Sequence, residues 1–213
     1  MIKFLKRHLG RQLNHPKGLF GLVIGRFMNN HNRLMYSDVY QLLKLSSNDN
    51  VLEIGFGNGA FVKELVTKID PGEYCGIDIS DTMISSATRK NSALIKSGKV
   101  KLSKANVILL PFKDQTFDKV FTLNTIYFWE DPQRVMLEIK RVLKPNGIFV
   151  VGLSTKQSMQ DNDYFHEHFT LYEKEEVERL FTDFGFKILK TTYSALKFED
   201  VLCIKGLVWA NAP

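Results

Sequence analysis

The sequence predicts an α/β protein: a seven-stranded, mostly parallel, Rossmann-like sheet with helices on both faces, an antiparallel last strand and an N-terminal helical cap. Three observations predict this class. Short apolar runs alternate with segments of helical periodicity over most of the chain. A glycine-rich turn joins the first apolar run to a helical segment. The last two runs are only about six residues apart, too close for a helical crossover, so we expect them to be antiparallel.

The domain organisation follows from length and composition. The 213 residues, 44% of them hydrophobic, are enough for one large core. We expect a basic arm and helical cap over residues 1–45, followed by a single globular unit over residues 46–213. Strands are expected near residues 50–55, 73–78, 100–104, 118–123, 147–153, 186–193 and 200–208, and helices near 33–45, 59–69, 81–96, 132–143 and 173–184.

The first elements rest on hydrophobic periodicity. Val39, Leu42 and Leu43 recur at helical spacing, whereas the glycines within residues 18–25 predict a pliant lead-in to that helix. The apolar run that follows is short enough for a buried strand, and residues 61–69 then repeat at helical spacing. The glycine-rich turn therefore lies between a strand and a helix.

The later boundaries rest on capping and turn residues. Ser80 or Asp81 can cap the helix that follows the second strand, and Pro132 after an Asp is typical of a helix start. The segment Lys144–Gly147, with the sequence KPNG, ends a helix and turns into a strand. Strands that alternate with helices in this way indicate a parallel sheet covered on both faces.

The formal net charge of +6 is concentrated in the arm. Residues 1–26 hold six Lys or Arg and no acid, so the remainder of the chain is neutral. Ile2, Leu5, Leu9 and Leu13 fall on one helical face among these basic residues. The arm is either a helix that packs on the core or a segment that contacts an anionic membrane surface or another polyanion.

The cysteines and the hydropathy pattern predict a cytoplasmic protein. Cys75 and Cys203 fall inside expected strands without metal-ligand spacing, which indicates buried free thiols. The sequence has no apolar run of membrane-spanning length, and its first residues lack the apolar core of a secretory signal.

The glycine-rich turn, Glu53-x-Gly55-x-Gly57-x-Gly59, predicts a ligand site. With Ala60 it matches the dinucleotide fingerprint, so an oxidoreductase that uses a nicotinamide cofactor is one reading. Glu53 argues against that reading, because a carboxylate at the end of the strand repels a pyrophosphate and attracts a cation.

Four motifs resemble those of the class I S-adenosylmethionine (SAM)-dependent methyltransferases. They are EIGFGNG at 53–59, GIDIS at 76–80, LPF at 110–112 with Phe117-Asp118, and RVLKPNG at 141–147. Their order and spacing cover residues 45–155, and the resemblance is to small-molecule and ubiquinone or menaquinone methyltransferases. It implies methyl transfer from SAM, with S-adenosylhomocysteine (SAH) as product.

The resemblance also implies a set of cofactor contacts. The glycines line the methionine and ribose parts of SAM, Glu53 lies near its amino group, and Asp78 accepts hydrogen bonds from both ribose hydroxyls. Ile79 and Met83 either pack on the adenine or belong to the core. Asn106 stands where the family often has an Asp for the adenine amine. The implied cofactor-binding residues are Tyr36, Glu53, Gly55, Phe56, Gly57, Gly59, Asp78, Ile79, Met83, Asn106, Val107 and Asn124.

Tyr127, Phe128 and Trp129, together with Asn32 of the cap, are candidates for the acceptor site. The aromatic cluster either forms an apolar wall for a flat or lipid-like small molecule or packs under the cap. The segment from Asn124 to Tyr127 resembles the Asn-Pro-Pro-Tyr motif of methyltransferases that act on nucleic-acid amines. Both prolines are replaced, which argues with the neutral body against a nucleic-acid substrate.

Catalysis by this chemistry needs no metal, and no metal is predicted. His166-x-His168 offers too few ligands for a closed site. These two histidines and His31 are the candidate general bases, since a free imidazole titrates near neutral pH. A non-catalytic SAM-binding or membrane-associated protein is a further alternative. The long segment 154–170 is a candidate lid.

Overall fold

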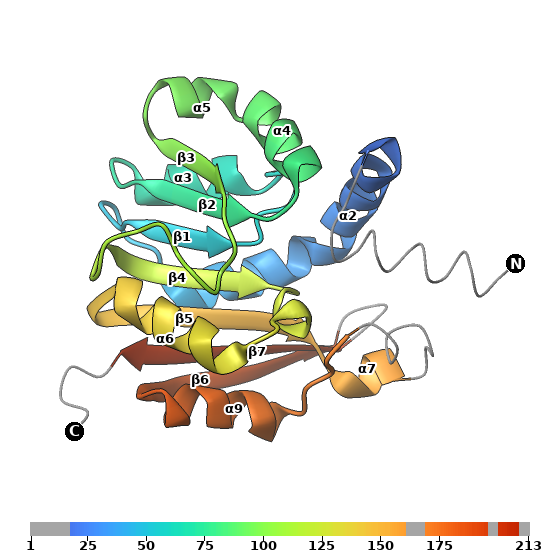
Figure 1. Ribbon diagram of the computed structural model, residues 1–213, viewed down its shortest axis with the longest axis vertical. Coiled ribbons are helices and arrows are strands. Elements are labelled where there is room, and N and C mark those ends of the chain that lie inside the picture. Colours follow the sequence, from blue (N-terminus) through green and yellow to red (C-terminus); the bar gives the residue numbers. More distant parts are fainter. Residues whose placement is uncertain (1–17, 161–168, 196–199, 209–213) are drawn as a thin grey trace, which may run out of the picture.

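The structure, a computed structural model, describes residues 18–160, 169–195 and 200–208. Its strands are β1 (Val51–Ile54), β2 (Tyr74–Asp78), β3 (Val100–Lys104), β4 (Phe117–Leu123), β5 (Leu143–Ser154), β6 (Phe186–Ala195) and β7 (Asp200–Val208). They form a seven-stranded sheet in the order β3-β2-β1-β4-β5-β7-β6 (Figure 1). β1 to β5 pair in parallel, and β7 is antiparallel to both β5 and β6. The predicted class and the antiparallel last strand are confirmed.

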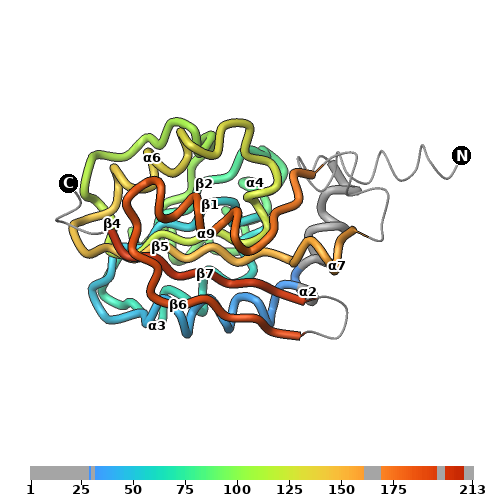
Figure 2. Tube along the Cα trace, turned by 90° about the horizontal axis from the view of Figure 1, so that it is seen from below, coloured from blue at the N-terminus to red at the C-terminus, as the bar shows by residue number. Residues whose placement is uncertain are grey.

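Helices cover both faces of the sheet. They are α2 (Gly18–Leu43), α3 (Val62–Ile69), α4 (Asp81–Lys90), α5 (Ser92–Lys96), α6 (Pro132–Val142), α7 (Lys156–Gln160) and α9 (Lys174–Asp183), with a 3-10 turn η1 (Ile126–Phe128). Buried residues of α2 and α3 form one apolar cluster with the sheet, and those of α6 and α9 form another on the opposite face. Figure 2 shows α2 and α3 on one side of the strands and α6 on the other.

Three elements differ from the sequence-based expectation. The first helix begins at Gly18 rather than near residue 33, so the glycines expected to loosen the lead-in lie inside α2. The helix expected over 81–96 is broken at Asn91, whose side-chain amide donates to the backbone carbonyls of Ala87 and Gly59. The candidate lid contains the short helix α7, and its residues 161–168 lie outside the described part of the chain.

Of two other boundary predictions, the helix cap is confirmed and the strand start differs. Ser80 caps α4 by accepting a hydrogen bond from Met83 N at 3.3 Å. β5 begins before the predicted KPNG turn, at Leu143, and the turn lies where the pairing of β4 with β5 is irregular.

The N-terminal region is described only from residue 18. The C-terminal half of α2, from Met35 to Leu43, packs its apolar side chains into the sheet, as expected of a cap. Residues 1–17, and with them the contact of the arm with a membrane or another polyanion, lie outside the described residues. No helix within the described residues is long and apolar enough to span a bilayer.

The strand order determines where a ligand can bind. β1 lies between β2 and β4. From β1 the chain continues through β2 and β3 toward one edge of the sheet, and it then returns to β4 and continues through β5 toward the other edge. At such a switch point the loops after adjacent parallel strands diverge and leave a crevice at their carboxyl ends. The loops after β1, β2, β3 and β4 all meet at this edge of the sheet.

Candidate functional site

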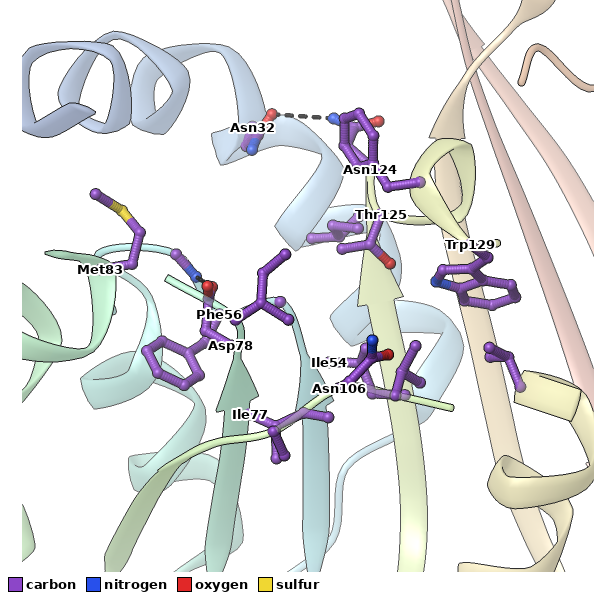
Figure 3. A pocket seen from close by; sticks show the side chains of 18 of the residues that line it. Asn32, Ile54, Phe56, Ile77, Asp78, Met83, Asn106, Asn124, Thr125 and Trp129 are labelled. Carbon is purple, nitrogen blue, oxygen red and sulfur yellow. Dashed lines mark hydrogen bonds between the residues drawn. The ribbon is translucent and has the colours of Figure 1, made fainter. Parts of the chain in front are cut away.

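A pocket of about 340 Å³ lies at this edge, between the loops after β1 to β4 and about two turns of α2 (Figure 3). Of the residues predicted to bind cofactor or acceptor, those that line it are Asn32, Tyr36, Gly55, Phe56, Gly57, Asp78, Ile79, Met83, Asn106, Val107, Asn124, Phe128 and Trp129. Glu53, Gly59 and Tyr127 lie behind its wall. The structure therefore brings most of the predicted residues together.

The glycine-rich turn forms the floor next to β1. Gly55, Gly57 and Gly59 all have positive φ angles, of 78°, 57° and 66°, which side-chain-bearing residues adopt only with strain. A Cβ on Gly55 would overlap Thr125, and one on Gly59 would approach Ala87 to 2.7 Å. A Cβ on Gly57 would meet no heavy atom within 4 Å, because Gly57 faces the pocket. Two glycines therefore allow the turn to pack, and the third leaves space for a ligand.

Asp78 ends β2 and holds the turn from the side. Its Oδ2 accepts a hydrogen bond from Gly57 N at 2.9 Å, and its Oδ1 accepts one from Ser80 N at 2.9 Å. Burial raises the pKa of Asp78 to about 6, although these backbone donors act in the opposite direction. A carboxylate offers about four acceptor positions, so Asp78 can also accept from a ligand hydroxyl.

Glu53 lies beneath the pocket rather than in its wall. Its side chain is buried, and its two oxygens accept hydrogen bonds from the hydroxyls of Tyr36 at 2.5 Å and Tyr74 at 2.6 Å. Burial raises the pKa of Glu53 to about 7, against the effect of both hydroxyls. Because Tyr36 belongs to α2 and Tyr74 to β2, this carboxylate joins the cap to the sheet.

We predict that Glu53 makes the folded protein less stable as the pH rises from about 4.5 to about 7. Over this interval the Glu53 carboxyl group keeps its proton in the folded protein and loses it in the unfolded chain. Its contribution to the free energy of unfolding is therefore complete below the unfolded pKa of Glu53 and is lost as the pH rises through the folded pKa. Thermal unfolding of the wild type and of Glu53→Gln across this range measures the effect. The variant is expected to lose this part of the slope, and equal slopes would contradict the raised pKa.

The pocket wall carries negative but no positive charge. Besides Asp78, Glu130 and Asp131 contribute to its rim. No Lys, Arg or His is among the lining residues in the part of the chain that the structure describes. A bound cation would be attracted by these carboxylates, whereas a phosphate or carboxylate would be repelled.

The segment after β4 closes the pocket opposite Asp78. Asn124 takes a left-handed conformation, and its side chain donates to Asn32 Oδ1 of α2 at 3.3 Å across one end of the pocket (Figure 3). Its Oδ1 accepts from the Tyr127 hydroxyl at 3.2 Å. Tyr127 is buried and also bonds the backbone of Ser154, so it supports the wall from behind, whereas Phe128 and Trp129 line the pocket.

The loop after β3 is held in place by α6. Arg141 donates to the backbone carbonyls of Leu110 and Phe112, and Glu138 accepts from Leu110 N at 2.7 Å. These bonds fix the loop just beyond Asn106, whose own Oδ1 accepts from Ile108 N. The Asn106 amide group faces the pocket without a negative charge.

Several site features were not predicted from the sequence. Phe61 stacks on Tyr36 with ring centroids 3.9 Å apart, and both line the pocket with Asn58 and Thr125. For Phe61 the sequence predicts only a place on the apolar face of a helix. Asn58 and Thr125 could have been identified from the sequence, because each lies within a motif described above.

The predictions on catalysis fall mainly outside the described part of the chain. His166, His168 and the side chain of His31 are not described, so the choice of general base stays a prediction. The described residues contain no cluster of His, Cys, Asp or Glu able to hold a metal ion.

Comparison with known proteins gives consistent matches. The profile described as "Methyltransferase domain" matches residues 52–151. The Bacillus subtilis protein YrhH, named as a methyltransferase, is 33% identical over 57% of this chain and 67% of its own length. A demethylmenaquinone methyltransferase of Lactiplantibacillus plantarum is 33% identical over 70% of this chain and 66% of its own. The crystal structure of a SAM-dependent methyltransferase from Aquifex aeolicus superposes with a TM-score of 0.73 at 19% identity, covering 87% of this chain and 97% of that one.

Proposed function

Since this chain belongs to the methyltransferase domain family and is a SAM-dependent methyltransferase, we propose that the pocket at the ends of β1 to β4 binds SAM and presents its methyl group to a neutral small molecule. The observation that carries this proposal is the pairing of the open space above Gly57 with the Asp78 carboxylate beside it. The first admits the amino-acid part of the cofactor close to the backbone, and the second suits two adjacent ribose hydroxyls.

The charge of the pocket supports SAM over a dinucleotide. SAM carries an ammonium, a sulfonium and one carboxylate but no phosphate, so its net charge is positive, whereas a dinucleotide carries a negatively charged pyrophosphate. The described wall offers carboxylates and no cation, and the buried Glu53 lies below the glycine turn. A pyrophosphate at this place would lose its hydration and gain no positive partner. A nicotinamide-dependent oxidoreductase is therefore disfavoured by the site as well as by the family.

The same charge argument limits the kinds of molecule that can accept the methyl group. An acceptor with a phosphate or carboxylate near the reacting atom would need a Lys, Arg or metal ion, and the described lining residues supply none of these. Phe128 and Trp129 offer apolar surface, and the amides of Asn32 and Asn124 offer neutral hydrogen-bonding groups. The similarity to a demethylmenaquinone methyltransferase supports a neutral, ring-containing acceptor.

The proposed roles of the residues are positioning and exclusion of water. SAM supplies a methyl group on a positively charged sulfur, and its transfer is an in-line displacement. Asp78 and Gly57 fix the cofactor at one end of the pocket, and the bond between Asn32 and Asn124 closes the other end. An acceptor that must lose a proton needs a base, for which the histidines named from the sequence remain candidates. A cytoplasmic location also stays a prediction.

Calorimetric titration of the purified protein tests this function. We expect saturable binding of SAM and SAH and none of NAD. ATP is the matched control, because it shares the adenosine of SAM but carries phosphates in place of the amino acid. Binding of NAD or ATP without binding of SAM and SAH would contradict this function and would indicate that the glycine turn binds a nucleotide phosphate.

A further inference from the structure

Trp129 carries an unsatisfied hydrogen-bond donor. Its Nε1 is the one buried side-chain nitrogen or oxygen, among the residues that the structure describes, that has no hydrogen-bond partner. The side chain is 7% exposed and forms part of the pocket wall, directly after η1. Burial of a donor without an acceptor costs free energy, and native proteins rarely retain such a group without a reason.

The indole nitrogen lies on the pocket side of the ring. Figure 3 shows this edge of Trp129 turned toward the side where Thr125 and Asn106 lie. Neither neighbour accepts from the indole N–H: Thr125 Oγ1 bonds Thr122, and Asn106 Oδ1 accepts from Ile108 N. Because this N–H faces the pocket and no described protein atom accepts from it, a bound ligand can supply the acceptor.

The positions of the other polar groups decide which part of the ligand this is. Asp78 and Trp129 lie on opposite sides of Asn106 in the view of Figure 3, whereas Asn32 and Asn124 close the far end of the pocket. A nucleoside with its ribose on Asp78 and its base next to Asn106 would extend toward Trp129. The acceptor and the transferred methyl group would then lie toward Asn32 and Asn124.

We propose that the indole N–H of Trp129 donates a hydrogen bond to a ring nitrogen of the adenine of bound SAM. The inference rests on the proposed function and reassigns Trp129 from the acceptor to the cofactor. Purine ring nitrogens carry in-plane lone pairs, and an indole N–H can only donate. Trp129 is thus a specificity-determining residue, because its N–H can bond a base that has a nitrogen at this ring position but not a base that has a C–H there. It adds a second contact to the base, beside the uncharged amide of Asn106.

The test uses SAH and its 1-deaza, 3-deaza and 7-deaza analogues, each of which replaces one ring nitrogen by C–H. Calorimetry on the wild type is expected to show that one analogue binds about tenfold more weakly than SAH and the other two do not. Trp129→Phe keeps an aromatic wall but removes the donor. It should bind SAH about tenfold more weakly than the wild type and no longer distinguish the sensitive analogue. Trp209→Phe, at the other tryptophan of the chain, is the control and should behave as the wild type.

A second measurement does not depend on how well the variant folds. The two tryptophans give two indole N–H signals in a proton–nitrogen NMR spectrum, and that of Trp129 is expected to move downfield when SAH is added. Equal binding of all four compounds by the wild type would overturn the inference, as would unchanged discrimination by Trp129→Phe. A signal that stays in place with SAH would do the same. Failure of the wild type to bind SAH would instead overturn the proposed function, and this inference with it.

Discussion

Replacement of Asp78 by Asn is expected to weaken SAM binding by about tenfold to a hundredfold. The Asp78 carboxylate can accept hydrogen bonds from two ribose hydroxyls while it holds Gly57 N and Ser80 N. An amide keeps only one acceptor oxygen and no charge, and hydrogen bonds to a charged group contribute about 1.5–3 kcal/mol each. Calorimetric titration with SAM and SAH measures the loss.

Asp81→Asn is the matched control for this change. Asp81 also follows β2, but its side chain is 75% exposed and pairs with Lys104 instead of lining the pocket. Its replacement should change SAM affinity by less than about twofold, as expected for an exposed ion pair. If both variants bind SAM as the wild type does, Asp78 does not hold the ribose.

The pH dependence provides an independent check on Asp78. Burial raises its pKa to about 6, and a bound cation lowers the pKa again. SAM affinity should therefore decrease as the pH falls through this value, because the protonated carboxyl group offers less charge and fewer acceptors. Asp78→Asn should remove that part of the pH dependence, provided that Glu53 is left unchanged.

The fold was predictable because its signals are local. Each apolar run, the glycine turn and the acidic residue at the end of each of the first two strands is a signal of only a few residues, and the parallel sheet follows from the alternation of such runs with helical segments. The first helix is predicted from residue 33, and its earlier start at Gly18 is not, because glycine weakens a helix locally. The packed C-terminal half of α2 stabilises the helix that continues through these glycines.

The parts of the site that were missed depend on contacts between distant residues. Glu53 was expected to face the ligand, yet tyrosines 17 and 21 positions away bind its two oxygens. The break at Asn91 is fixed by a bond to Gly59, 32 residues earlier. Sequence spacing gives the residue types at a strand end, but it does not show which of them a remote side chain has already engaged.

Gly55→Ala and Gly57→Ala are expected to fail in different ways. Alanine at Gly55, where φ is 78°, adds left-handed strain and a Cβ that overlaps Thr125. We expect a loss of about 2–5 kcal/mol in the free energy of unfolding, from backbone strain together with overpacking. Alanine at Gly57 meets no protein atom, so only the strain of about 1–2 kcal/mol applies, while its methyl group occupies the space proposed for the cofactor.

The double variant Gly55→Ala with Thr125→Ser separates strain from overlap. Serine removes the Thr125 methyl group that the new Cβ would meet and keeps the hydroxyl that bonds Thr122. Chemical denaturation should show that the double variant recovers the overpacking part of the loss, about 1–3 kcal/mol, but not the backbone strain. Gly57→Ala should lose only the strain of about 1–2 kcal/mol in the free energy of unfolding, and it should bind SAM at least about tenfold more weakly, because its methyl group occupies space that the cofactor needs. Normal SAM binding by a folded Gly57→Ala protein would show that the open space above this glycine is not where the cofactor lies.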